Sequence, residues 1–417
     1  MSFLNFIKLR NNLSYLLIFL IFSCSGDSID ENISSVVPQN PSEDSNNDNS
    51  STNSSSNTST TDNSSNQTTP QTFNREQMLI FWADSIIIPS QNKFQSDLIE
   101  FSNSVNSFSN DPTQASLDLM RENWVIAYKS WQYIEMFDIG KAEEINFSPR
   151  MNIYPVNTER TDLNISNRVD DISNPNNFSS QGFPALDYLL HGIASSESDI
   201  LDIYLAVDNS FEINNHLKYL KLVSNQMLEL TNIVINDWEN SYRDTFVSST
   251  ENTATSSINM MTNDFIYYYE KRFRANKIGI PAGVFSGGTL PDRVEAFFKK
   301  SVSKTLAIDA IDAITNFFNG VSFNNNTSES GLSFKDYVEF LETKKNDSPL
   351  GDLITDQFEL SKTGLGELND DFTLQLDENK LKMLEVYDKI QAAVVLMKVD
   401  MLQALNINVD YVDADGD

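Results

Sequence analysis

The 417-residue sequence is poor in the side chains that build common metal and catalytic sites. It has one cysteine, Cys24, and two histidines, His191 and His216. One cysteine allows no disulfide within the chain and no zinc site made of several thiolates, and two histidines allow no three-histidine metal site. The sequence also lacks HExxH, GxSxG and a glycine-rich phosphate loop, which excludes the conventional hydrolase designs.

Basic charge is also scarce. The chain has 29 lysine and arginine residues against 59 aspartate and glutamate residues, which gives a formal net charge of -30. A field of this sign repels phosphate backbones, so we expect no nucleic-acid partner. Aromatic residues are abundant, with 27 phenylalanines and 14 tyrosines, and they are sufficient to fill the cores of two ordinary domains.

The N-terminus has the pattern of a lipoprotein signal peptide. Lys8 and Arg10 precede an apolar run at residues 13–22, which is too short to span a bilayer. A serine and then Cys24 follow, and this order resembles a bacterial lipobox, in which the cysteine is lipidated. We expect residues 1–23 to be a signal peptide and Cys24 to be the anchor of an outer-membrane lipoprotein that faces the periplasm or the cell surface. The alternative is an uncleaved anchor or a buried thiol.

The rest of the chain divides into a polar segment and a helical part. Residues 24–72 are mostly Ser, Asn, Thr and Asp, and they bury too little apolar area to offset their ordering entropy, so we expect a disordered tether. Beyond residue 73, apolar residues recur at spacings of three and four, and no alternating strand pattern is convincing. The sequence therefore predicts an all-α fold of two packed helical bundles, residues 73–250 and 251–417. One predicted helical stripe consists of Phe94, Leu98, Phe101, Val105 and Phe108.

A second helix is predicted to begin at Asp111-Pro112, an acceptor at the N-cap followed by proline, and to end near Phe137. In this helix Glu135 follows Trp124, Tyr128 and Trp131 at helical spacing. A glutamate on such a face needs an ionic partner, a bound cation or a proton if it is buried. The alternative is a glutamate at the edge of the stripe that reaches solvent.

The segment QGFPALDYLLHG, residues 181–192, combines several candidate site residues. Pro184 is predicted to begin a helix, because proline has no N–H and suits a first turn, and Gly192 is predicted to end it. Asp187 and His191 then project one turn apart and could share a metal or a hydrogen bond. The alternative for His191 is a residue near the helix C-terminus that the macrodipole favours.

Other polar segments offer weaker candidates. Residues 152–163 are predicted to be a loop, in which Glu159 could face a cleft or take part in a surface ion-pair cluster. Basic segments at residues 271–283 and 297–304 could neutralise carboxylates at a domain interface or receive an anionic ligand. His216 is expected at a solvated helix start.

Several segments together resemble the imelysin family, helical lipoproteins of the bacterial envelope that are associated with iron uptake and were first described as insulin-cleaving membrane proteases. The resemblance implies two helical bundles with a GxHxxE signature between them, whose histidine and glutamate are proposed metal ligands. In this chain Gly182 matches the glycine, Pro184 occupies the histidine position and Asp187 the glutamate position, so one nitrogen ligand is missing. The segments that carry the resemblance, between residues 75 and 417, are SIIIPSQNKF, NWVIAYKSWQYIEMFDIG, NIYPVNTERTDL, QGFPALDYLL, RVEAFFKKSVS and LNINVDYVDADGD.

These observations lead us to expect a non-catalytic binding protein, held to the membrane by its lipid anchor, with iron, haem or an envelope protein as partner. The expected ligand cleft contains Glu135, Glu159, Asp187 and His191, and no catalytic residue is assigned. The residues themselves identify no cofactor, and iron or another divalent metal follows from the resemblance. The alternatives are an imelysin-type metallopeptidase with a degenerate motif, and a surface module that presents residues 271–304 to a partner protein.

Overall fold

The computed structural model describes residues 72–206, 213–323 and 329–411. Within these ranges the chain is helical apart from turns and two strands of two residues each, so the predicted all-α fold is confirmed. The expected signal peptide, Cys24 and all but the last residue of the expected tether lie outside the described residues. No helix in the described ranges combines the length and the apolar character that a membrane span requires.

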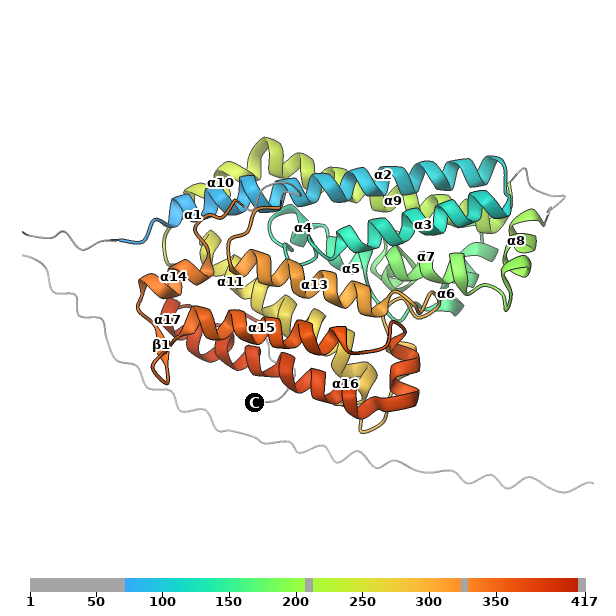
Figure 1. The fold of residues 1–417 in the computed structure, drawn as a ribbon. Helices are drawn as coiled ribbons and strands as arrows, with labels where there is room; N and C mark the ends of the chain where they lie inside the picture. The colour runs from blue at the N-terminus through green and yellow to red at the C-terminus, as the bar shows by residue number, and fades with distance from the viewer. Residues whose placement is uncertain (1–71, 207–212, 324–328, 412–417) are drawn as a thin grey trace, which may run out of the picture. The chain divides into compact units, whose positions relative to one another are not determined.

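Two groups of helices pack together in the unit formed by residues 68–417. In the first group α2 packs against both α3 and α9, and in the second α15 lies between α13 and α16 (Figure 1). The elements of the first half are α1 (Arg75–Phe81), η1 (Trp82–Ile87), α2 (Ile88–Asn110), α3 (Gln114–Trp131), α4 (Lys141–Glu144), α5 (Phe147–Met151), α6 (Thr158–Ser166), η2 (Pro175–Ser180), α7 (Gly182–His191), α8 (Glu197–Leu205), α9 (Asn215–Asp237), η3 (Trp238–Tyr242) and α10 (Arg243–Ser248).

The second half continues the helical pattern with one short hairpin, in which β1 pairs antiparallel with β2. Its elements are α11 (Ser257–Tyr267), η4 (Tyr268–Gly279), α12 (Ile280–Ala282), η5 (Pro291–Arg293), α13 (Ser303–Phe318), α14 (Phe334–Phe340), β1 (Lys344–Lys345), β2 (Ser348–Pro349), α15 (Leu350–Gly366), α16 (Phe372–Val395), η6 (Leu396–Met401) and α17 (Leu402–Leu405).

The two groups share a continuous apolar core. Trp82, near the start of the described chain, is buried and its ring packs against Phe317 of α13 and Phe334 of α14. Helices α3 and α13 also touch, with Lys129 Nζ lying 3.8 Å from Asp309 Oδ2. Burial of aromatic side chains from both halves of the sequence therefore holds the groups together.

The predicted apolar stripe of α2 is buried at all five positions, but the boundaries predicted for α3 are wrong. Its N-cap is Thr113, because the Thr113 and Ser116 side chains form a reciprocal capping box that Asp111-Pro112 does not provide. The helix ends at Trp131, where the backbone tightens into turns with bonds from residue i to i−3. Glu135 consequently lies in the turn after the helix and not on its face.

Four long helical rods contain a π-helical stretch, namely η1, η3, η4 and η6. The longest of them in the described residues is η4, with 12 residues. Long π-helical stretches are rare, and π-helical turns often occur at functional sites because they redirect side chains. This π-helix supplies Tyr268, Arg272 and Lys277 to the polar interior.

Candidate functional site

The motif segment forms helix α7 in a tightly packed setting. The helix begins at Gly182, two residues before the predicted start at Pro184, and Gly192 caps its end as predicted. Gly182 has φ +71°, and a Cβ at this position would lie 2.1 Å from the carbonyl oxygen of Met151. Only glycine tolerates both the left-handed conformation and this approach. Pro184 still falls in the first turn, where its missing N–H leaves no helical bond unmade.

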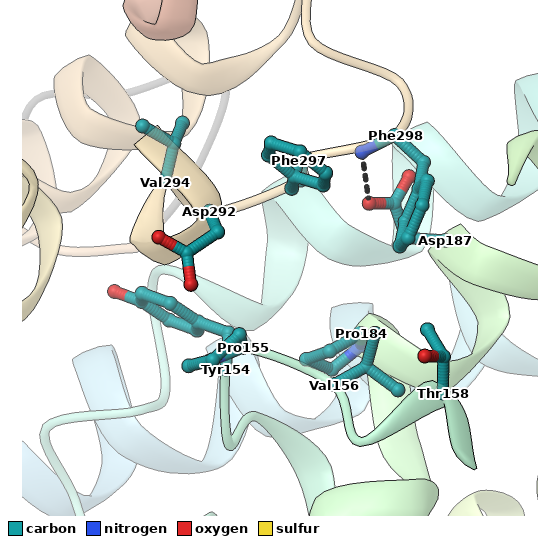
Figure 2. Close-up of a pocket in the computed structure, with 11 residues that line it drawn as sticks. Tyr154, Pro155, Val156, Thr158, Pro184, Asp187, Asp292, Val294, Phe297 and Phe298 are labelled. Carbon is teal, nitrogen blue, oxygen red and sulfur yellow. Dashed lines mark hydrogen bonds between the residues drawn. The ribbon is translucent and has the colours of Figure 1, made fainter. Parts of the chain in front are cut away.

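Asp187 ties α7 to a loop of the second half. Its carboxylate accepts a hydrogen bond from the backbone N–H of Phe298 at 2.8 Å (Figure 2). It accepts a second from the backbone N–H of Lys299 at 2.9 Å. The side chain is buried, and burial raises the pKa of Asp187 to about 7, although the two amide bonds act in the opposite direction. Each carboxylate oxygen therefore already has a partner, so this group positions the loop.

The histidines are packed and not clustered. The ring of His191 lies edge-on to Trp124 with 5.6 Å between centroids, and its Nε2 is buried without a hydrogen-bond partner among the described residues. Burial, aided by the nearby Arg121 and Lys299 charges, lowers the pKa of His191 to about 3, so the ring is neutral at pH 7. His216 is in the first turn of α9 as predicted, but it is half-buried, because it packs against Tyr204.

Glu159 is exposed in the first turn of α6. The prediction of a loop throughout residues 152–163 is therefore wrong from residue 158 onward, because the Asn157 side chain accepts from Arg160 N and caps the helix. Asp162, one turn further along, accepts a hydrogen bond from Tyr188 at 3.0 Å. Glu159 lies apart from the polar interior described next.

Glu135 belongs to a buried polar cluster between the two groups of helices. Asn152 Nδ2 donates to Glu135 Oε1 at 3.2 Å and to Glu295 Oε1 at 2.9 Å. The hydroxyl of Tyr128 donates to Asn152 Oδ1 at 2.6 Å. Glu135 is only 5% exposed, and desolvation raises its pKa although Lys277 opposes the shift. One amide thus bridges two carboxylates that belong to different halves of the chain.

Lys277 neutralises this cluster. Its Nζ lies 2.5 Å from Glu295 Oε2 and donates to Gln132 Oε1 at 2.7 Å. The two charged side chains are 2% and 3% exposed. Lys277 lies in the basic segment 271–283, and for this residue the structure shows the first of the two predicted alternatives, the neutralisation of a carboxylate. A charge this deeply buried requires such partners because its desolvation is costly.

An acidic cavity of about 340 Å³ adjoins the cluster. Its wall includes four oxygen atoms that are buried and make no hydrogen bond with the described residues. They come from the turns after α3, from α11 and from η4. These atoms are Glu135 Oε2, Asp138 Oδ1, Asp264 Oδ2 and the hydroxyl oxygen of Tyr268. The lining also contains Glu143, Asp410, Tyr267, Tyr411 and one cation, Arg272.

Burial and the crowding of carboxylates favour protonation in this cavity. Burial, together with the neighbouring carboxylates of Asp138, Glu143 and Asp410, raises the pKa of Asp264 to about 8. Burial also raises the pKa of Asp138, which Arg272 counteracts. In the absence of a counter-cation, protons therefore limit the charge of the cavity.

A second cavity, of about 280 Å³, lies beside the motif helix. Pro184 and Asp187 form part of its wall, together with Val156 and Phe297 (Figure 2). Its lining is mainly apolar, and Asp292 contributes an exposed carboxylate. The four residues expected in one cleft are therefore in different surroundings: Glu135 lines the acidic cavity, Asp187 the apolar one, His191 packs on Trp124, and Glu159 is exposed.

Comparison with known proteins identifies the family of this chain. The family model of imelysin matches residues 87–399. The chain belongs to the imelysin family. A curated relative, iron-regulated protein A of Synechococcus elongatus, is 23% identical over 142 residues, and the match covers 33% of this chain and 38% of that protein. The alignment thus spans less than half of the relative.

Two solved structures share the imelysin fold. An imelysin-like protein from Psychrobacter arcticum superposes with a TM-score of 0.61 at 16% identity, covering 81% of this chain and 97% of that one. A protein described as an iron-regulated protein A precursor, from Parabacteroides distasonis, gives a TM-score of 0.62 at 17% identity, with 78% and 95% covered. At this level of identity the likeness establishes the fold.

Within this imelysin fold the motif positions and the acidic cavity differ in chemistry. The described residues include no group of three or more His, Cys, Asp or Glu side chains arranged to hold a metal ion directly. Sequence reasoning singled out Glu135 but missed Asp138, Asp264 and Tyr268, because no local pattern shows that residues 135–138 lie beside residues 264–268. Only the acidic run at 135–144 and the tyrosine-rich start of η4 hinted at them.

Asp187→Asn measures the cost of burying this carboxylate. The pKa of Asp187 in the folded protein, about 7, is above its ordinary value of 3.8, so the folded protein holds the proton more tightly than the unfolded chain. The stability from this group is complete below about pH 4 and is lost as pH rises through about 7. We therefore expect the variant to gain stability relative to wild type across this range in urea denaturation. A difference independent of pH, or the same trend in Asp292→Asn, would contradict this.

Lys277→Met tests the buried ion pair. Removing the ammonium leaves Glu295 charged and unpaired in the interior, which costs about 3–5 kcal/mol of unfolding free energy. The double variant Lys277→Met/Glu295→Gln removes the orphaned charge and should recover part of this loss. Guanidinium denaturation of both variants gives the comparison, and a single variant within about 1 kcal/mol of wild type would show that the pair behaves like a surface contact.

Proposed function

We propose that this imelysin-family protein is a non-catalytic binding protein of the cell envelope, associated with iron uptake, and that its acidic cavity holds a cation. The observation that carries the proposal is the set of buried carboxylate and tyrosine oxygens that face this cavity without a partner among the described residues. Buried polar groups without partners are costly, and a cationic ligand would satisfy them. Carboxylate and phenol oxygens suit hard cations.

The association with iron is supported by the relatives. Two of them, from Synechococcus elongatus and Parabacteroides distasonis, carry the name iron-regulated protein A. The charge of the cavity favours an iron cation over haem, because haem carries carboxylates of its own and five carboxyl groups line the site, against one guanidinium. Iron in this proposal is cargo and not a resident cofactor.

The non-catalytic part of the proposal rests on the motif positions. Proline has no lone pair to offer a metal, so Pro184 removes one ligand from the motif. Asp187 uses both carboxylate oxygens on backbone amides. A hydrolytic metal site needs about three protein ligands and an open position for water, and these residues do not supply them.

The basic segments support an internal role more than a partner-binding one. Lys277 is buried against Glu295, and Lys271 and Lys304 pair with Glu270 and Asp370 within the chain. These contacts satisfy three of the eight basic residues that a surface module at residues 271–304 would have presented. We therefore place ligand binding at the acidic cavity.

Binding of ferrous iron is the direct test. Anaerobic equilibrium dialysis of the full chain, purified in detergent and followed by elemental analysis, should show one bound iron whose affinity rises between about pH 6 and pH 8.5. The sign follows because the pKa of Asp264 is raised to about 8, so its proton must leave before the cation binds. Asp264→Asn should weaken binding about tenfold, whereas Asp292→Asn should not. Absence of iron binding at every pH would remove the proposal.

The envelope location rests on the N-terminal sequence, and the word precursor in the name of the Parabacteroides distasonis protein supports export. Lipidation of Cys24 would fix the mature N-terminus in the membrane, with residues 25–71 as a spacer. We expect the wild-type chain to partition into the detergent phase of a cell extract and Cys24→Ser to appear in the soluble fraction or remain unprocessed. Equal partitioning and processing of the two would contradict lipid anchoring.

A further inference from the structure

We propose that the acidic cavity holds its cation through hydrogen bonds donated by the cation's own shell, as a hydrated metal ion or an ammonium group does, and not by direct coordination. This inference rests on the proposed function, because it specifies the class of cation for the same site. It concerns the form in which the ligand is held.

The unpartnered atoms are acceptors that surround a space. Glu135 and Tyr268 are 5% and 2% exposed, and each places on the cavity wall an oxygen that has no partner among the described residues. Asp138 and Asp264 each add one such carboxylate oxygen. The four atoms come from two segments, the turns after α3 and the continuous rod of α11 and η4, so the cavity presents acceptors from more than one side. A ligand that donates several hydrogen bonds would satisfy them together.

Direct coordination demands closer convergence than the described residues provide. Oxygen ligands lie about 2.0–2.6 Å from a divalent cation, and several must reach the same ion. The described part of the chain has no group of three His, Cys, Asp or Glu side chains in such an arrangement. A shell of water or amine donors extends the reach of the ion by one hydrogen bond, so carboxylates too far apart for direct ligation can still hold it. Magnesium sites in proteins commonly retain several waters for a related reason.

The size of the cavity fits such a ligand. Its volume is about 340 Å³, while six waters at roughly 30 Å³ each occupy about 180 Å³. A hydrated ion or a short polyamine therefore enters without displacing side chains. A bare metal ion would leave most of this space to solvent.

The charges that face the cavity favour a multivalent cation. Five carboxyl groups line it, from Glu135, Asp138, Glu143, Asp264 and Asp410. The single opposing charge in the lining is Arg272, which counteracts the rise in pKa of Glu135 and Asp138 but forms no ion pair with them in the described chain. Lys277, which also lies near Glu135, already forms an ion pair with Glu295. Uncompensated negative charge therefore remains for the ligand to neutralise.

Tyrosine rings in the lining provide an aromatic surface against which an ammonium group can bind. Tyr267, Tyr268 and Tyr411 line the cavity, and the rings of Tyr267 and Tyr411 lie 5.3 Å apart. Aromatic faces attract alkylammonium and amine-bearing ions through their quadrupole. The cavity thus combines acceptors for N–H or O–H donors with aromatic walls.

Hexaamminecobalt(III) separates the two modes of binding, because it does not exchange its ammonia ligands and so binds only through their N–H groups. Titration calorimetry with the full chain in detergent should show binding that ferrous iron competes with. We expect Asp264→Asn and Tyr268→Phe each to weaken it about tenfold. Asp292→Asn, an exposed carboxylate of the other cavity, is the matched control and should bind as wild type. Unchanged melting temperatures would confirm that the variants are folded.

The outcomes distinguish this inference from the proposed function. Binding of ferrous iron without binding of hexaamminecobalt(III) overturns the inference and leaves the function in place. Binding of hexaamminecobalt(III) without ferrous iron retains the inference and removes the association with iron. Failure of both probes removes both proposals.

Two further titrations identify the source of the donors. Competition by magnesium, which keeps its water shell, points to a hydrated metal ion, whereas competition by spermidine alone points to an organic polyammonium ligand. If neither displaces hexaamminecobalt(III), the cavity binds the probe but recognises neither a hydrated metal ion nor a polyammonium ligand, and the inference is wrong.

Discussion

The buried ion pair of Lys277 and Glu295 is the constraint on which the polar interior depends. Both side chains are almost fully removed from solvent, so each requires the other and a set of neutral partners. Gln132 and Asn152 provide these partners from the first half of the chain. The pair therefore obliges the turn after α3 and the π-helix η4 to stay together, and the acidic cavity forms beside their junction.

The π-helix carries this constraint from the core to the cavity. One continuous rod places Tyr268 and Arg272 on the cavity wall and Lys277 in the buried cluster. Near the start of η4, Glu270 binds Lys398 and the hydroxyl of Tyr411, which brings the last described residues of the chain to the same wall. A change in the helical geometry of η4 would move Tyr268, Arg272 and Lys277. The shape and the charge of the cavity therefore depend on this one helix.

The motif segment and the acidic cavity divide two roles between them. Asp187 is a carboxylate with both oxygens satisfied, and it holds the loop at Phe298 against α7. Glu135, Asp138 and Asp264 are carboxylates that each have one oxygen without a hydrogen-bond partner among the described residues. A satisfied carboxylate contributes to architecture, whereas an unsatisfied one has capacity for a ligand. The acidic cavity, and not the signature positions, therefore has the capacity for a ligand.

The sequence by itself determined the helices, because periodicity and glycine positions act over a few residues. It predicted the buried stripe from Phe94 to Phe108 and the end of α7 at Gly192, and it left open whether Glu135 is buried with a partner or reaches solvent. Pattern alone did not predict the helix limits that are set by side-chain capping. Helix α3, for example, is capped by Thr113 and not by Asp111. Only the tertiary structure decided which carboxylates meet: Glu135 and Asp264 are far apart in the chain, and the burial of aromatic cores from both halves, which no local pattern encodes, brings them to one cavity.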